Sequence, residues 1–134
     1  MKSFCLRLQL AYLIKHIKIN SDSLKSIRTI DISPSGKYLG AVCKIGQTGY
    51  ECFIWDLHTN ELIFHDSRSY IYKMQFSPDE QHFVLSDAYP KPELKTNYIY
   101  LYSTNPMKYE GVLGTHDAAI TDLCFSHDGK YLAS

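Results

Sequence analysis

Apolar and polar residues follow one shared pattern in three stretches of the chain. Each stretch opens with an isoleucine, at positions 27, 71 and 120, and continues as an alternating run to a serine turn. The stretches begin 44 and then 49 residues apart. Alternation with a period of two residues is typical of a half-buried β-strand, and recurrence after roughly 40–50 residues indicates a repeat architecture. The pattern predicts an all-β chain built from repeated units.

Each complete unit is expected to hold four antiparallel strands. Proline at the second position and glycine at the fourth position of Ser33–Gly36 favour a tight turn after the first strand. Glu80 stands in the second unit where the other two units have Gly36 and Gly129. The expected strands are 27–32, 38–43, 52–57 and 61–65 in the first unit, 71–76, 82–86, 98–103 and 109–113 in the second, and 120–125 and 131–134 in the third.

The first 25 residues support two interpretations. Phe4, Leu6, Leu8 and Leu10 alternate as a strand would, and the repeat predicts the outer strands of a preceding unit here. Leucines and isoleucines in the same segment also fit one face of a helix, and several of the residues favour a helix. Both alternatives, strand and helix, stay open at this point.

The second-to-third-strand connection of the second unit is longer than that of the first. It spans residues 88–97 and carries two prolines, which cannot donate hydrogen bonds to a sheet ladder. The equivalent connection of the first unit is 44–49, and equivalent loops leave a repeat structure on the same side. The candidate partner-binding residues on the longer loop are Tyr89, Lys91, Glu93 and Lys95.

The repeated segments resemble the WD-repeat (WD40) family of β-propellers. The resemblance rests on Ser33–Leu39, on Ile54-Trp55-Asp56, on His116 with Ile120 four residues later, and on Ser126–Ser134. It implies successive four-stranded antiparallel blades, about two and a half to three in number, in an incomplete ring. The implied propeller segment is 26–134, with blades near 26–67, 70–115 and a truncated 118–134, while 1–25 is a separate N-terminal segment.

The resemblance also implies structural roles for four residues. Trp55 and Asp56 match the pair that ends the third strand of a blade, and Tyr102 takes the place of that tryptophan in the second unit. His116 matches the blade histidine. The sequence departs from the family because no Gly-His element precedes Ile27 or Ile71 and no unit holds a complete His, Ser/Thr, Trp and Asp set.

A second propeller class is similar to part of the chain. The stretch from Asp31 through Leu62 also looks like blades of prolyl-oligopeptidase-like proteins, in which the propeller accompanies a separate hydrolase domain. This similarity implies, as an alternative, the accessory propeller of a serine hydrolase whose catalytic domain is not in this chain.

Composition and motifs argue against catalysis and against nucleic-acid binding. Fourteen Lys and Arg balance fourteen Asp and Glu, whereas phosphate-binding proteins usually carry a basic excess. There is no Gly-x-Ser-x-Gly elbow, no phosphate-binding glycine loop, and no Cys or His at metal-ligand spacing. We therefore expect no catalytic, cofactor-binding or metal-binding residues, and no enzymatic activity.

The expected role is that of a non-enzymatic protein–protein interaction scaffold, as a fragment of a longer propeller protein. Propellers close with four to eight blades, so further blades from a longer chain or from a partner are expected to complete the ring. The expected partners are other proteins, with no nucleic acid and no membrane. No run of 18 apolar residues occurs, and no signal peptide is recognised at Met1–Arg7, so we expect an intracellular, cytoplasmic location.

Overall fold

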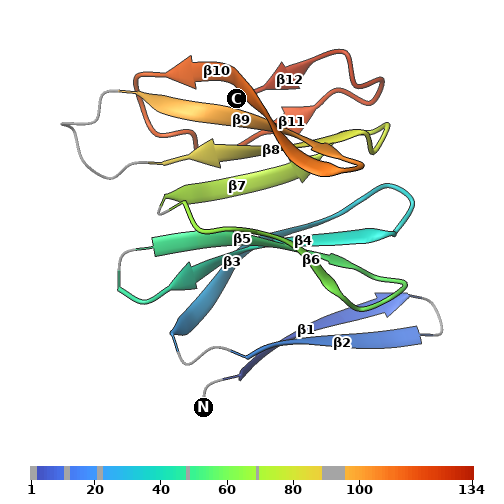
Figure 1. Cartoon of the computed structure of the whole chain (residues 1–134). Coiled ribbons are helices and arrows are strands. Elements are labelled where there is room, and N and C mark those ends of the chain that lie inside the picture. The colour runs from blue at the N-terminus through green and yellow to red at the C-terminus, as the bar shows by residue number, and fades with distance from the viewer. Residues whose placement is uncertain (1–2, 11–12, 21–22, 48, 69, 89–95) are drawn as a thin grey trace.

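The chain forms a row of antiparallel β-sheets packed face to face (Figure 1). A computed structural model describes residues 3–10, 13–20, 23–47, 49–68, 70–88 and 96–134. Two four-stranded sheets occupy the middle of the row, with one two-stranded sheet near each end of the chain. All regular elements in the described residues are strands, so the expected all-β fold is confirmed.

The strands follow one another along the chain in the order in which they pair. The first four-stranded sheet has the order β3-β4-β5-β6 and the second the order β7-β8-β9-β10, while β1-β2 and β11-β12 are two-stranded. The bounds are β1 Ser3–Leu10, β2 Leu13–Asn20, β3 Leu24–Ile32, β4 Tyr38–Ile45, β5 Gly49–Asp56, β6 Leu62–Asp66, β7 Ile71–Phe76, β8 His82–Asp87, β9 Asn97–Thr104, β10 Met107–His116, β11 Cys124–Phe125 and β12 Leu132–Ala133.

Alternation along each strand sends side chains to two different cores. In β4, Val42 belongs to the core between the two four-stranded sheets, whereas its neighbours Ala41 and Cys43 belong to the core on the opposite face. That opposite core also contains Ile17 of β2, so the N-terminal hairpin packs on the first four-stranded sheet. A third core joins Val84 and Ile99 to residues of the segment before β11.

Aromatic rings dominate the core between the two four-stranded sheets. The Phe64 ring of β6 meets Phe83 and Tyr102 of the second sheet edge-on, at centroid distances of 5.2 and 5.3 Å. Phe83 and Tyr102 stack on each other at 4.9 Å, and they are also register partners on β8 and β9. Buried rings of this size contribute more free energy than aliphatic side chains because each buries a large apolar area.

The segment at residues 3–20 is a β-hairpin, which is the strand interpretation of the two that the sequence left open. The order of strands also follows the repeat, because β2 is followed by the first strand of the next sheet, β3, just as β6 is followed by β7 and β10 by β11. The helical alternative does not describe this segment.

The third unit differs from its expected strands. Strands were predicted over 120–125 and 131–134, but only 124–125 and 132–133 are paired. Ile120 and Leu123 are nevertheless buried in the third core, and the Ile120 N–H donates to the carbonyl of Asp87 at 3.3 Å. The segment before Cys124 therefore packs against the second sheet without forming a regular ladder.

Part of the second four-stranded sheet is left uncovered beside β11 and β12. A depression of about 400 Å³ lies there, with Leu101, Leu113, Phe125 and Leu132 among its lining residues. Leu113 is 50% exposed and Tyr131 is 74% exposed. Strands β11 and β12 cover only part of the face that a four-stranded neighbour would cover, and the ring is not closed.

The structure excludes a cross-strand disulfide between Cys43 and Cys52. Cys52 pairs with Val42 in the register of β4 and β5, so Cys43 points to the opposite face of the sheet. Both thiols are buried and free, and the Cys52 Sγ lies 3.9 Å from the Met74 Sδ. These cysteines act as small apolar core residues.

A side chain at Gly40 would force the buried Met74 side chain to change its position. A Cβ atom there would lie 2.1 Å from the Sδ and 2.3 Å from the Cε of Met74, which is itself buried. The G40A variant should therefore lose about 1–3 kcal/mol of unfolding free energy through overpacking, measured by urea denaturation. At Gly114, where the nearest atom would be 3.8 Å away, G114A is the matched control and should change stability little. Equal effects of the two substitutions would contradict this packing.

Candidate functional site

Trp55 and Tyr102 occupy equivalent positions in the two four-stranded sheets. Trp55 pairs with Leu39 across β5 and β4, and Tyr102 pairs with Phe83 across β9 and β8. Both rings are buried, and Trp55 stacks on Phe53 at 5.9 Å. The Tyr102 hydroxyl donates to the carboxylate of Asp66. Each ring faces the preceding sheet in the row, which places both residues in packing contacts.

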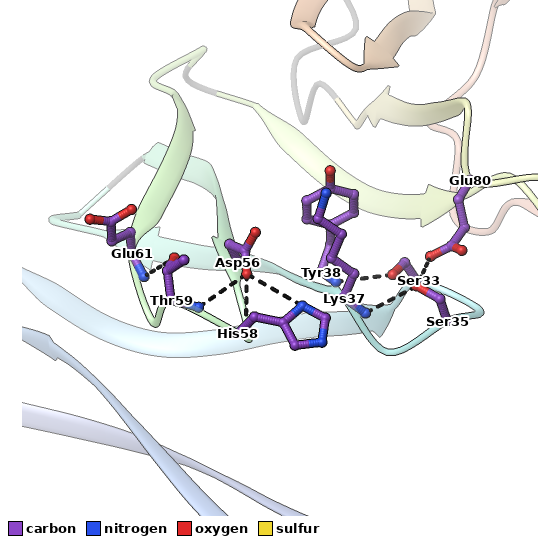
Figure 2. A network of polar contacts seen from close by, with 9 residues as sticks. All are labelled: Ser33, Ser35, Lys37, Tyr38, Asp56, His58, Thr59, Glu61 and Glu80. Carbon is purple, nitrogen blue, oxygen red and sulfur yellow. Dashed lines mark hydrogen bonds and ion pairs between the residues drawn. The ribbon is translucent and has the colours of Figure 1, made fainter.

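Asp56 organises the turn that follows β5 (Figure 2). Its Oδ1 accepts the N–H of His58 at 2.7 Å and the N–H of Thr59 at 3.2 Å. The Thr59 hydroxyl in turn accepts the N–H of Glu61. An aspartate side chain that accepts from the backbone two residues ahead is a common way of fixing a turn.

His116 lies at the end of β10 and is exposed. Its Nε2 lies 2.6 Å from the Oγ of Ser134, which follows β12. The contact joins the second four-stranded sheet to the two-stranded sheet beside it. The structure does not bring His116 together with Trp55, Asp56 or Tyr102, and the roles that the resemblance implies for these four residues stay predictions.

The candidate loop residues Tyr89, Lys91, Glu93 and Lys95 lie outside the described residues. The residues that lead into this loop are described. Asp87 pairs with Ile71 at the start of β7, and the Ala88 N–H donates to the carbonyl of Tyr70 at 3.1 Å. The shorter connection between β4 and β5 is held similarly, because the Gly46 N–H donates to the carbonyl of Ser23 just before β3.

Two opposite edges of the sheet row can therefore be defined. The loop edge contains the ends of β4 and β8 and the starts of β3, β5, β7 and β9. The turn edge contains the β3–β4 and β7–β8 turns together with the β5–β6 and β9–β10 turns (Figure 1).

On the turn edge, Glu80 adopts a backbone conformation that usually requires glycine. Its φ is 57°, close to the 77° of Gly36 and the 71° of Gly129 at the equivalent positions. A non-glycine residue pays for this conformation, and Glu80 has compensating contacts. Its Oε1 accepts the Ser35 hydroxyl at 2.7 Å, which links the turns of the two sheets (Figure 2), and its carbonyl accepts the Thr104 hydroxyl.

The innermost strands of successive sheets are joined by contacts between equivalent positions. The Asp31 carboxylate of β3 accepts the Phe76 N–H of β7 at 2.7 Å, and the Gln75 amide of β7 accepts the Phe125 N–H of β11 at 3.0 Å. Asp31 and Gln75 occupy the same place in their units, two residues before the turn serine. An outward-facing N–H of each receiving strand is thereby satisfied by a side chain of the preceding sheet. We call this series of contacts the inner-strand ladder.

The inner-strand ladder continues at the loop edge with charged and aromatic side chains. The Lys73 ammonium lies 2.9 Å from the carboxylate of Asp122, again between equivalent positions of two units. One residue earlier in the repeat, the Arg28 guanidinium lies 3.3 Å from the ring centroid of Tyr72. The Tyr50 ring at the start of β5 is 5.7 Å from the same guanidinium. The sequence did not predict the grouping of Arg28, Tyr72 and Tyr50, because the alternation of apolar and polar residues does not show where a strand forms a β-bulge.

A second arginine fixes the connection between β6 and β7. The Arg68 guanidinium lies over the rings of Tyr100 and Tyr109, at 4.5 and 4.9 Å, and its Nε is 3.3 Å from the carboxylate of Asp66. Tyr100 also donates to Asp87 at 2.7 Å. Burial and this acidic partner raise the pKa of Tyr100, so its hydroxyl remains a donor at neutral pH.

The described residues offer little chemistry for catalysis. Burial raises the pKa of the Cys43 thiol to about 12, so this cysteine is not an activated nucleophile. No group of three or more His, Cys, Asp or Glu side chains is arranged to hold a metal ion within the described ranges. No helix in the described part of the chain could cross a membrane.

Comparisons with known proteins agree with the architecture. A chain in the crystal structure of the mitotic checkpoint complex is 11% identical, with a TM-score of 0.69 over 97% of this chain and 38% of its own. Hydrazine synthase of Kuenenia stuttgartiensis is 19% identical, with a TM-score of 0.64 over 89% of this chain and 39% of its own. A prolyl endopeptidase is 16% identical, with a TM-score of 0.61 over 91% of this chain and 20% of its own.

These likenesses show the fold alone, since all three identities are low, and the chain spans less than half the length of each of these structures. No curated protein matches the chain by sequence. The family model for the WD domain, G-beta repeat (WD40), matches residues 107–134. The chain is a partial β-propeller, and residues 107–134 carry a WD40 repeat.

Two substitutions of Glu80 separate the stability effect of its left-handed backbone from that of its hydrogen bond with Ser35. E80A keeps the left-handed conformation and loses the bond from Ser35, so it should unfold about 1 kcal/mol more easily than wild type. E80G loses the same bond but relieves roughly 1 kcal/mol of backbone strain, so it should be close to wild type. Thermal or urea unfolding measures both. An E80G variant no more stable than E80A would contradict the assignment.

Asp31 should give the inner-strand ladder a pH dependence. Burial raises the pKa of Asp31 above its usual value, outweighing the hydrogen bonds from Phe76 and Ile32. The contribution of Asp31 to stability is therefore fully present below the unfolded-state pKa and declines as pH rises through the folded-state pKa.

The D31N variant keeps an acceptor for Phe76 without this charge. It should be at least as stable as wild type at neutral pH, and its advantage should shrink as the pH falls toward the unfolded-state pKa. D31A, which leaves the Phe76 N–H without an acceptor, should lose about 1–3 kcal/mol. Urea unfolding across the acid-to-neutral range tests both variants, and an advantage of D31N that grows in acid would contradict the sign.

Proposed function

We propose that this chain is part of a longer, non-enzymatic propeller protein that serves as an intracellular, cytoplasmic scaffold for other proteins. The WD40 repeat supports the proposal, because WD40 propellers commonly bind proteins and are usually non-catalytic. On this proposal, further blades supplied by the longer chain or by a partner complete the ring and cover the apolar surfaces beside the two outer sheets.

The observation that carries the proposal is the grouping of loops and contact residues on the loop edge. The residues that lead into the two equivalent connections lie there, held by Ser23 just before β3 and by Tyr70 just before β7. The same edge carries Arg28, Tyr50 and Tyr72. With Trp, Tyr and Arg are the residue types most enriched where protein partners bind tightly. The candidate loop adds one aromatic residue and charges of both signs, Tyr89, Lys91, Glu93 and Lys95, and the prolines of this loop reduce the ordering cost of binding.

Site-specific photo-crosslinking in cells tests the proposal. A photoreactive phenylalanine analogue at Tyr50, on the loop edge, should form discrete protein adducts. The same analogue at Lys37, on the turn edge, should not. Removal of residues 90–95 should leave the melting temperature nearly unchanged and should reduce the adducts from Tyr50. Equal adducts from both edges, adducts only with nucleic acid, or no adducts would contradict the scaffold.

The alternative is the accessory propeller of a prolyl-oligopeptidase-like serine hydrolase. It is supported by the likeness to the prolyl endopeptidase structure, which reaches the same fold at 16% identity. The reading frame beyond Ser134 separates the two functions. A Gly-x-Ser-x-Gly motif there favours the hydrolase, whereas additional Gly-His and Trp-Asp repeats favour the scaffold.

A further inference from the structure

Two β-bulges at equivalent positions bring Arg28 and Tyr72 together. The register of β3 and β4 shifts between Ile27 and Thr29, and the register of β7 and β8 shifts between Ile71 and Lys73. Arg28 and Tyr72 are therefore the extra residues of the two bulges. A bulge re-aims a side chain out of the regular ladder, and bulges are over-represented next to functional sites.

The Arg28 guanidinium is held by rings and not by acidic groups. It lies 3.3 Å from the centroid of Tyr72 and 5.7 Å from that of Tyr50, and these two rings contact each other at 6.5 Å. Among the described residues, no carboxylate forms an ion pair with Arg28, and the residue as a whole is exposed. Stacking uses the face of a guanidinium and leaves the N–H donors along its edge available.

Two other cationic side chains of the chain, Arg68 and Lys73, differ from Arg28 because each forms an ion pair with a carboxylate. Arg68 is stacked on two tyrosines in the same manner, but its Nε is already paired with Asp66 at 3.3 Å. Lys73, next to Tyr72 in the chain, is paired with Asp122 at 2.9 Å. The Arg28 guanidinium thus has a fixed orientation, and no carboxylate in the described part of the chain is paired with its N–H donors.

We propose that Arg28, oriented by Tyr72 and Tyr50, is a recognition site for a carboxylate side chain of an acidic protein segment. This inference rests on the proposed scaffold function and names the chemistry of its partner. A guanidinium presents paired donors that match the two oxygens of a carboxylate. The balanced charge of the chain favours a carboxylate on a protein over the phosphates of a nucleic acid, which need a broad basic surface. The tyrosines add apolar contact area around the ion pair.

Fluorescence anisotropy with a labelled ten-residue glutamate peptide tests the site, with the matching glutamine peptide and a single-stranded DNA as comparison probes. Wild type should bind the glutamate peptide at least roughly ten-fold more tightly than either comparison probe. R28K keeps the charge but loses the planar fork, so it should bind roughly ten-fold more weakly than wild type. Y72F keeps the stacking ring and should bind like wild type, whereas Y72A should behave like R28K.

R68K is the matched control, because it makes the same substitution at a stacked arginine that is already paired. It should leave peptide binding unchanged. The proposal is overturned if wild type does not prefer the glutamate peptide, if DNA binds as tightly, or if R28K and R68K have the same effect. Circular dichroism confirms that each variant is folded, and the Arg28 Nε–H resonance should shift when the peptide is added.

The crosslinking yield from Tyr50 separates this inference from the function beneath it. Adducts that persist in R28K would leave the scaffold standing and remove the acidic-recognition site. Loss of adducts in R28K, together with unchanged adducts in R68K, would support both. If the chain with the analogue at Tyr50 and the native Arg28 forms no adducts, that result would count against the scaffold itself, whether or not the glutamate peptide binds.

Discussion

Face-to-face packing of successive sheets is the constraint on which the rest of this structure depends. A four-stranded sheet whose strands alternate apolar side chains to both faces cannot bury them alone, so each sheet needs a neighbour on each side. Between the two complete sheets this need is met by Phe64, Phe83 and Tyr102, whose rings pack within 5.3 Å of one another. Beside the two-stranded sheets it is met only in part, which explains the apolar depression next to β12.

Polar contacts fix how the sheets are aligned. Apolar packing is non-directional and would allow two sheets to slide, whereas the bonds from Phe76 to Asp31 and from Phe125 to Gln75 connect fixed positions. Glu80 adds a third such link at the turn edge, through Ser35. The inner-strand ladder therefore sets the spatial relation between units, and with it the positions of Arg28 and Tyr72 at the loop edge. Binding of a partner at the loop edge would therefore depend on the alignment of the sheets, which is fixed by residues that the partner does not contact.

Much of the fold could be predicted from the sequence, and less of the candidate site. Alternation and the turn at Ser33–Gly36 predicted the strands of the two complete units, because both signals are local. The third unit was predicted less well, since whether 120–123 joins a ladder depends on neighbouring strands and not on its own residues. The pairing of Arg28 with Tyr72 could not be foreseen, because it needs two bulges in register. The resemblance suggested a structural His116, but its exposed contact with Ser134 follows from tertiary geometry.

Direct packing of the two four-stranded sheets against each other underlies every other feature of this structure. Nuclear Overhauser spectroscopy on the chain in solution, with the aromatic rings selectively labelled, measures this contact most directly. We predict cross-peaks from the ring protons of Phe64, on β6, to those of both Phe83, on β8, and Tyr102, on β9. A folded chain that gives the Phe83–Tyr102 cross-peak within the second sheet but none to Phe64 would contradict this packing.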